Sequence, residues 1–199
     1  MNLVGWGSVA IGALVLAGSV VGALGPVIPA SEARVFRAVN RLPDGLYRPL
    51  WVPMQLGNLV VGSVAGLIVA AGLREWRVAV AVVAAVALKL LAERVLRRRM
   101  AAHLGVRQRP GTSEPGAVLR GADVPATGPS FPSGHVILVA AVTSVVVEMV
   151  SSPWALLAFA MPLLVMFGRV YVGAHNPLDV SAGLGAGLIV GGALAVVLG

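Results

Sequence analysis

The sequence predicts an all-α, polytopic membrane protein with six transmembrane helices and one interfacial helix. Of its 199 residues, 58% are hydrophobic and only 12% are charged, whereas soluble domains have about 45–50% apolar and about 25% charged residues. A spanning helix takes about 20 residues, so a single membrane domain (1–199) has room for six spans. Their expected positions are about 3–30, 56–73, 78–96, 133–150, 154–167 and 180–198.

The first apolar stretch has no charged residue before Glu32. A cleaved signal peptide is the alternative, because Ser31-Glu32-Ala33 is similar to a small-residue cleavage site. Signal peptides, however, open with a basic region and have a short apolar core. Here no Lys or Arg precedes Arg34 and the apolar stretch is long, so we expect a retained span.

Segment 31–50 has the pattern of a helix that lies in the membrane interface. Its apolar and basic residues are expected on opposite sides of the helix. The apolar side would contain Val35, Phe36, Val39 and Leu42, and the basic side Arg34, Arg37 and Arg41. Pro43-Asp44-Gly45 predicts a turn. Tyr47 and Trp51 follow it as interfacial aromatics.

The polar connections are expected to separate onto two membrane faces. Counting spans places 31–50, 97–130 and 168–178 on one face, with both termini, 74–77 and 151–153 on the other. All three histidines and 12 of the 15 basic residues lie on or near the first face. The chemistry is therefore expected at one end of the bundle, whose helices we expect to pack closely through glycines at four-residue spacing, namely Gly18/Gly22, Gly62/Gly66 and Gly183/Gly187/Gly191.

Pro132-Ser133-Gly134-His135 opens the fourth expected span. Ser is favoured as an N-cap and Pro near a helix start. The free N–H groups of a helix entrance suit an anion, and Gly134 would let an oxygen ligand approach the backbone. The alternative is a capped transmembrane helix with an interfacial histidine.

Arg169, His175 and Asp179 precede the sixth expected span. With a spacing of four, Asp179 could accept a proton from one nitrogen of His175 and leave the other free as a nucleophile. Asp179 also fits a helix start capped by Asn176. A His/His/Asp metal site is a third reading.

The connection between the third and fourth spans carries Arg107-Gln108-Arg109-Pro110. Two arginines one residue apart, before a backbone fixed by proline, suit the binding of an oxyanion. The alternative is a solvated basic loop.

Together, Arg109-Pro110, Pro132-Ser133-Gly134-His135 and Arg169-x5-His175-x3-Asp179 resemble the three-part signature of the type-2 phosphatidic acid phosphatase superfamily. The resemblance implies a six-helix membrane phosphatase that needs no metal or other cofactor. It implies that His175 attacks phosphorus, Asp179 orients it, and His135 protonates the leaving oxygen and then activates water. The phosphate oxygens would be held by Arg109, Ser133, Gly134 and Arg169.

One position departs from this signature. The family has a lysine seven residues before the arginine of Arg-Pro, and here that position is Ala102. The substitutes considered are Arg98, Arg99, His103 and Arg107, whereas Lys89 is set aside because it is distant in sequence and lies within a span.

A site at the mouth of a helix bundle favours a phosphate tethered at the interface with its chain in lipid. We expect a lipid phosphate substrate, either a polyprenyl phosphate or diphosphate or one of the phosphatidic acid type, with membrane lipids as partners and no nucleic acid. A transporter, or a scaffold with an anion-binding face, is the alternative. A bacterial cell membrane is expected; the basic loops favour a cytoplasmic site and the resemblance an extracytoplasmic one.

Overall fold

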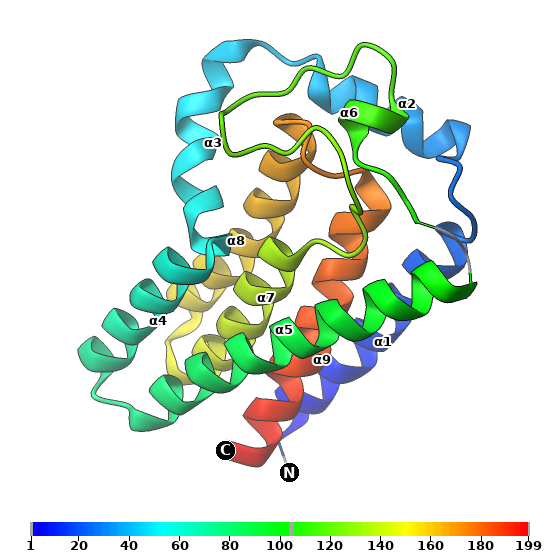
Figure 1. The fold of residues 1–199 in the computed structure, drawn as a ribbon. Coiled ribbons are helices and arrows are strands. Elements are labelled where there is room, and N and C mark those ends of the chain that lie inside the picture. Colours follow the sequence, from blue (N-terminus) through cyan, green and yellow to red (C-terminus); the bar gives the residue numbers. More distant parts are fainter. Residues whose placement is uncertain (1, 104–105, 199) are drawn as a thin grey trace.

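The computed structural model describes residues 2–103 and 106–198, and this part of the chain is helical without β-strands. Long helices form a bundle and short ones gather at one of its ends (Figure 1). The bundle consists of α1 (Leu3–Gly22), α4 (Leu59–Leu73), α5 (Trp76–His103), α7 (Gly134–Val146), α8 (Ser152–Tyr171) and α9 (Pro177–Leu198). The short helices are α2 (Ala30–Asn40), α3 (Tyr47–Met54) and α6 (Pro110–Ser113).

Among the described residues, three helices are long and apolar enough to cross a membrane: α1, α8 and α9. A fourth span is possible if the segment Asp44–Gly57 and helix α4 count as one, although they are bent by 76° at their junction. Helix α7, with the 3-10 turn that follows it, is apolar but shorter. The chain is thus an integral membrane protein, and its described residues contain three to four candidate spans, whereas the sequence predicts six.

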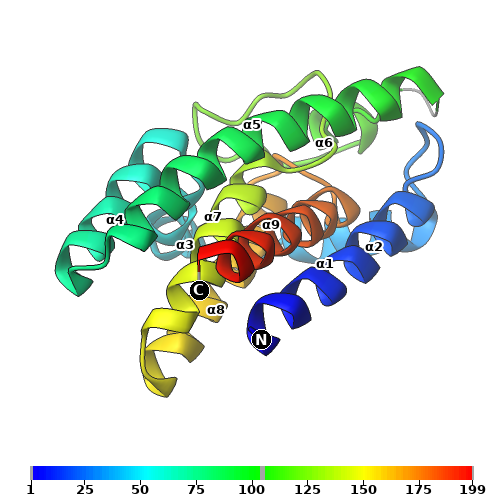
Figure 2. The ribbon, with the colours of Figure 1, turned by 90° about the horizontal axis from the view of Figure 1, so that it is seen from below.

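Helix α9 lies at the centre of the bundle, between α1 on one side and α5 and α7 on the other (Figure 2). Small residues allow these close contacts. A Cβ at Gly187 would lie 2.6 Å from the carbonyl oxygen of Ile137 in α7, and one at Gly185 would lie 2.7 Å from that of Gly12 in α1. The expected contact through Gly183/Gly187/Gly191 is confirmed, since all three face α7. Gly18 has no such neighbour, so the contact expected there is wrong.

The polar connections separate as the sequence predicts. The termini and the α4–α5 and α7–α8 turns lie at one end, and α2, α3 and the connection after α5 cover the other (Figure 1). Arg120 anchors that connection by donating to the carbonyl oxygens of Asn40 (2.8 Å), Leu42 (3.1 Å) and Tyr171 (2.9 Å). This covered end holds the site.

The expected interfacial segment is two helices rather than one. Helix α2 ends at Asn40, a 3-10 turn occupies Asp44–Leu46, and α3 follows. Phe36 is fully buried in the protein, whereas Val35 is 53% exposed. The face that α2 presents to the protein contains Phe36 together with Ala33 and Glu32.

Candidate active site

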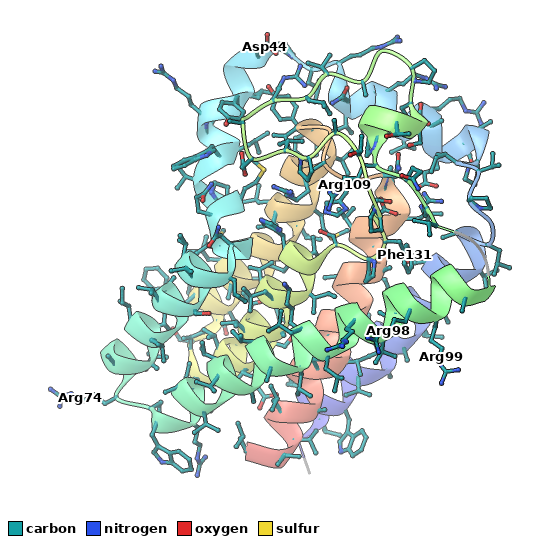
Figure 3. The ribbon with its side chains drawn as sticks, in the orientation of Figure 1. Asp44, Arg74, Arg98, Arg99, Arg109 and Phe131 are labelled. Carbon is teal, nitrogen blue, oxygen red and sulfur yellow. The ribbon has the colours of Figure 1, made fainter. Side chains whose placement is uncertain are left out.

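Segments distant in sequence meet at the covered end of the bundle. The main-chain N–H of Ser133, the N-cap of α7, donates to the carbonyl oxygen of Asp179 in the first turn of α9 (2.9 Å). Arg109 donates through Nη1 to the carbonyl oxygen of Ala174 (2.8 Å). The three segments singled out in the sequence are thereby joined, and Arg109 lies at this covered end (Figure 3).

His175 and Asp179 face each other at the entrance of α9. His175 Nδ1 and Asp179 Oδ2 are 3.8 Å apart, longer than a hydrogen bond, and both side chains are buried. Catalytic hydrogen bonds are often long before substrate binds. Burial lowers the pKa of His175 to about 4, with Asp179 opposing this shift, so the imidazole is neutral at neutral pH. With Nδ1 toward the carboxylate, Nε2 is the nitrogen left for reaction.

Asp179 is fixed through both of its carboxylate oxygens. Oδ2 accepts from the main-chain N–H of Asn176 (2.8 Å), and Oδ1 accepts from Arg107 Nε (2.8 Å). The N-capping and the orienting interpretations of Asp179 therefore describe the same carboxylate. Arg107 also donates through Nη2 to Glu32 in α2. Removing one partner of such a buried pair costs about 3–5 kcal/mol.

Several polar atoms where α7, α8 and α9 meet at the covered end are buried without a hydrogen-bond partner among the described residues. They include Ser133 Oγ, Arg169 Nε and His175 Nδ1. A buried donor without a partner costs about 1–3 kcal/mol, and such groups call for an explanation such as a ligand. Two of these groups, Ser133 Oγ and Arg169 Nε, can donate to an oxyanion beside the free N–H groups at the start of α7.

His135 lies in the first turn of α7 and is less deeply buried than His175. A Cβ at Gly57 would lie 2.6 Å from the His135 Cβ, so the backbone after α3 packs directly on this histidine. Arg169, His175 and Arg109 all act electrostatically on the His135 imidazole. The expected site residues therefore gather around one region.

A narrow pocket leads to His135 and Arg169, and its remaining wall includes Tyr47, Trp51 and Asp123. Its volume is about 20 Å³, room for about one water molecule. Together these side chains form a mouth in front of His135 and Arg169. The interfacial aromatics expected from the sequence belong to this mouth.

Three of the four residues considered as substitutes for the family lysine can be placed in the structure. Arg98 and Arg99 are exposed on α5, and Arg99 points away from the site (Figure 3). The His103 side chain lies outside the described part of the structure. Arg107 pairs with two carboxylates. Lys89, set aside for its distance in sequence, is instead among the charges acting on His135, because α5 packs against α7.

Among the side chains that the structure describes, no group of three or more His, Asp or Glu residues is arranged to hold a metal ion. Asp179 faces Arg107 and Asn176 rather than a second histidine. The His/His/Asp metal reading therefore has no ligand cluster in the described structure.

With this geometry in place, comparison with known proteins identifies the family. The model of the PAP2 superfamily matches residues 74–198, more than half of the chain. The chain belongs to the PAP2 superfamily. The matched region contains all three motifs, from Arg109 to Asp179.

Individual PAP2 proteins resemble the chain to different extents. An undecaprenyl-diphosphatase of Sulfolobus acidocaldarius is 46% identical over 56 residues, which are 27% of this chain and 26% of the relative's length. The fold is similar to that of Aquifex aeolicus LpxE (TM-score 0.66, 20% identity, covering 83% and 92% of the two chains). It is also similar to a PAP2-type phosphatidylglycerolphosphate phosphatase from Bacillus subtilis (TM-score 0.60, 18% identity, covering 98% and 93%).

Proposed function

We propose that this PAP2 protein is a lipid phosphate phosphatase that acts without a metal through a phosphohistidine on His175. The observation that carries the proposal is the meeting of the His175–Asp179 pair with Arg109, Arg169 and the start of α7. Phosphate-ester hydrolysis is among the slowest uncatalysed reactions. Its catalysis depends on donors fixed around the phosphoryl oxygens and on division of the reaction into two steps.

In the first step, His175 Nε2 attacks phosphorus and the bond from phosphorus to the lipid oxygen breaks. His135 gives its proton to the departing oxygen. Asp179 stabilises the positive charge that forms on His175 through Nδ1, which lies 3.8 Å from Oδ2. Arg109, Arg169, Ser133 and the Gly134 N–H hold the non-bridging oxygens.

In the second step, water attacks the phosphohistidine and the bond from nitrogen to phosphorus breaks. His135, now neutral, takes a proton from that water, which restores the state it had at the start. Inorganic phosphate leaves and His175 returns to its neutral form. A lipid diphosphate would release lipid monophosphate and inorganic phosphate by the same two steps.

An apolar cavity next to the site supports the proposal that the substrate carries a lipid chain. The cavity has a volume of about 440 Å³ and is lined by apolar residues of α4, α7 and α8. It includes Leu56, the neighbour of the Gly57 that packs on His135. A hydrocarbon chain in this cavity would place its phosphate near His135.

A polyprenyl phosphate or diphosphate is the first candidate substrate, because the relative with 46% identity is an undecaprenyl-diphosphatase. Phosphatidic acid and phosphatidylglycerol phosphate are the next candidates. The proposal includes six membrane crossings, with α5 and α7 added to the candidate spans, and a place in the cell membrane of a bacterium.

The test is release of inorganic phosphate by the purified full chain in detergent, with EDTA present. The substrates are a polyprenyl phosphate, a polyprenyl diphosphate, phosphatidic acid and phosphatidylglycerol phosphate. We expect release from at least one, abolished by Arg169→Gln and retained by Arg74→Gln, which changes an exposed residue at the opposite end (Figure 3). Absence of release from all four would contradict the proposal and favour an anion-binding transporter or scaffold. Loss of release with EDTA, restored by metal, would contradict the metal-independent mechanism.

A further inference from the structure

A buried array of three charged side chains connects α2 to the start of α9. Arg107 donates through Nε to Asp179 Oδ1 (2.8 Å) and through Nη2 to Glu32 Oε1. The Arg107, Glu32 and Asp179 side chains are only 1%, 4% and 0% exposed. Glu32 Oε1 also accepts from the main-chain N–H of Leu178 (2.8 Å). The array therefore ties the helix that covers the site to the segment carrying His175 and Asp179.

The geometry leaves Asp179 few other positions. The Asn176 N–H and Arg107 Nε each hold one of its oxygens, so rotation of the carboxylate would break at least one hydrogen bond. A carboxylate that orients a histidine must keep one direction while charge develops on the imidazole. Because Asp179 is fully buried, Arg107 also supplies the positive charge that keeps it ionised.

Glu32 has the corresponding role toward Arg107. A guanidinium is a planar fork whose direction is set by the groups it binds. Here one donor of the fork meets Asp179 and another meets Glu32. Without Glu32, Arg107 would keep a single carboxylate partner and could rotate about it.

We propose that Glu32 and Arg107 are positioning residues of the phosphatase reaction: Glu32 fixes the Arg107 guanidinium, and Arg107 fixes the carboxylate that orients His175. This inference rests on the proposed function. Neither residue needs to touch the substrate, and helix α2 belongs to the active site through Glu32. The rival is a direct contact of Arg107 with phosphate through Nη1, which has no partner among the described residues.

The central experiment compares Glu32→Gln with Glu114→Gln. The two glutamates are matched: each side chain is 4% exposed, and each takes part in an ion pair between α2 and the connection after α5, Glu32 with Arg107 and Glu114 with Arg37. Only the first pair reaches Asp179. We expect Glu32→Gln to lower kcat about 10-fold, comparable with losing an outer partner that orients a ligating histidine, with KM within about twofold. Glu114→Gln should leave both constants near wild type.

Arg107→Lys, alone and combined with Asp179→Asn, tests whether Arg107 acts on the reaction through Asp179. Lysine keeps the charge but has no fork, so Arg107→Lys should also lower kcat by about 10-fold or more at similar KM. In an Asp179→Asn background, Arg107→Lys should change kcat less than about twofold, because residues that act as one unit are not additive. Kinetics are normalised to folded protein by size-exclusion chromatography. Should Glu32→Gln not fold, Arg107→Lys and its double variant carry the test.

Three results would overturn the inference: equal loss of kcat in Glu32→Gln and Glu114→Gln, a raised KM at unchanged kcat in Arg107→Lys, or full additivity with Asp179→Asn. The first would reduce Glu32 to a structural tie, and the others would assign Arg107 to the phosphate or to an independent role. Wild-type protein that releases no phosphate would instead contradict the proposed function. The two failures are therefore distinguishable.

Discussion

The two histidines of the site are held in opposite ways. His175 is buried beside an aspartate that is itself fixed on both oxygens. His135 stands at the edge of a pocket, packed on the backbone of Gly57 and among positive charges. A nucleophile that becomes covalently bonded needs one fixed direction. A group that first gives a proton to the lipid oxygen and later takes one from water needs access to the pocket. The difference in environment thus predicts a difference in role.

The largest effect expected concerns the buried histidine. His175→Ala removes the nucleophile, so phosphate release from the lipid substrate should fall by at least about 10⁴-fold. The measurement is kcat for phosphate release, with Arg74→Gln as the folded control. Turnover of His175→Ala near the wild-type rate would show that the assignment of the nucleophile is wrong.

His135→Ala should affect the two steps unequally. Loss of a general acid–base group costs about 10²–10⁴-fold, and this loss is expected in full for a lipid phosphate. An aryl phosphate such as p-nitrophenyl phosphate has a leaving group that needs no proton. Stopped-flow absorbance should therefore show a burst of nitrophenolate followed by slow turnover. A variant equally slow in both phases would contradict the separate roles of the two histidines.

The deep burial of His175 also predicts a pH dependence of stability. Its pKa is lowered to about 4 in the folded protein from about 6.5 when unfolded. Between these values the unfolded chain binds more protons, so the free energy of unfolding should fall by about 3 kcal/mol as pH drops from 6.5 to 4. The asparagine of His175→Asn does not titrate, so this variant should lose less free energy of unfolding over the same pH range. Thermal unfolding in detergent at pH 7 and pH 5 measures the difference, and parallel losses in both proteins would contradict it.

Lys89 tests the positive surroundings of His135. If Lys89 supplies the charge that Ala102 does not, Lys89→Met should raise KM for the lipid phosphate by about 3- to 10-fold with little change in kcat. Arg98→Met changes an exposed cation on the same helix and is the matched control. Equal effects of the two substitutions would assign the change to general electrostatics rather than to the site.

The smallest effect is expected at the mouth of the pocket. Asp123 lines it beside Arg169 and acts electrostatically on that guanidinium. Because a carboxylate repels an entering phosphate, Asp123→Asn should lower KM by about 2- to 5-fold. Steady-state kinetics at low and high salt measures this change, which should shrink as salt screens the charge. A raised KM would show that Asp123 instead holds Arg169 in place.

The sequence could predict which motifs meet at the covered end of the bundle but not the contacts that support them. Arg109, Ser133, His135, Arg169, His175 and Asp179 lie in short motifs, so a local pattern is sufficient to find them. Glu32 and Arg107 are far from Asp179 along the chain, and only the packing of α2 joins them. Arg107 belongs to the Arg107-Gln108-Arg109-Pro110 motif, which does not reveal its partners, and the signal for Glu32 was an acidic residue in an otherwise basic interfacial helix. Lys89 was set aside on sequence distance, whereas the packing of α5 on α7 places its charge among those that act on His135.

For the helices, too, the sequence predicts local features but not those that depend on packing. Apolar composition locates the long helices, and glycine spacing identifies the face of α9 that meets α7. Composition could not place the bend of 76° before α4 or the short length of α7, since both depend on how the segments pack at the covered end.

The most direct measurement of the central claim is the trapping of the covalent intermediate. His135→Ala, incubated with an aryl phosphate and quenched at alkaline pH, should accumulate phosphate because its second step lacks a base. Mass spectrometry of the digested protein should then find the phosphate on His175, and none should be found in the His135→Ala/His175→Ala double variant. Phosphate on another residue, or its absence during a clear nitrophenolate burst, would contradict the account.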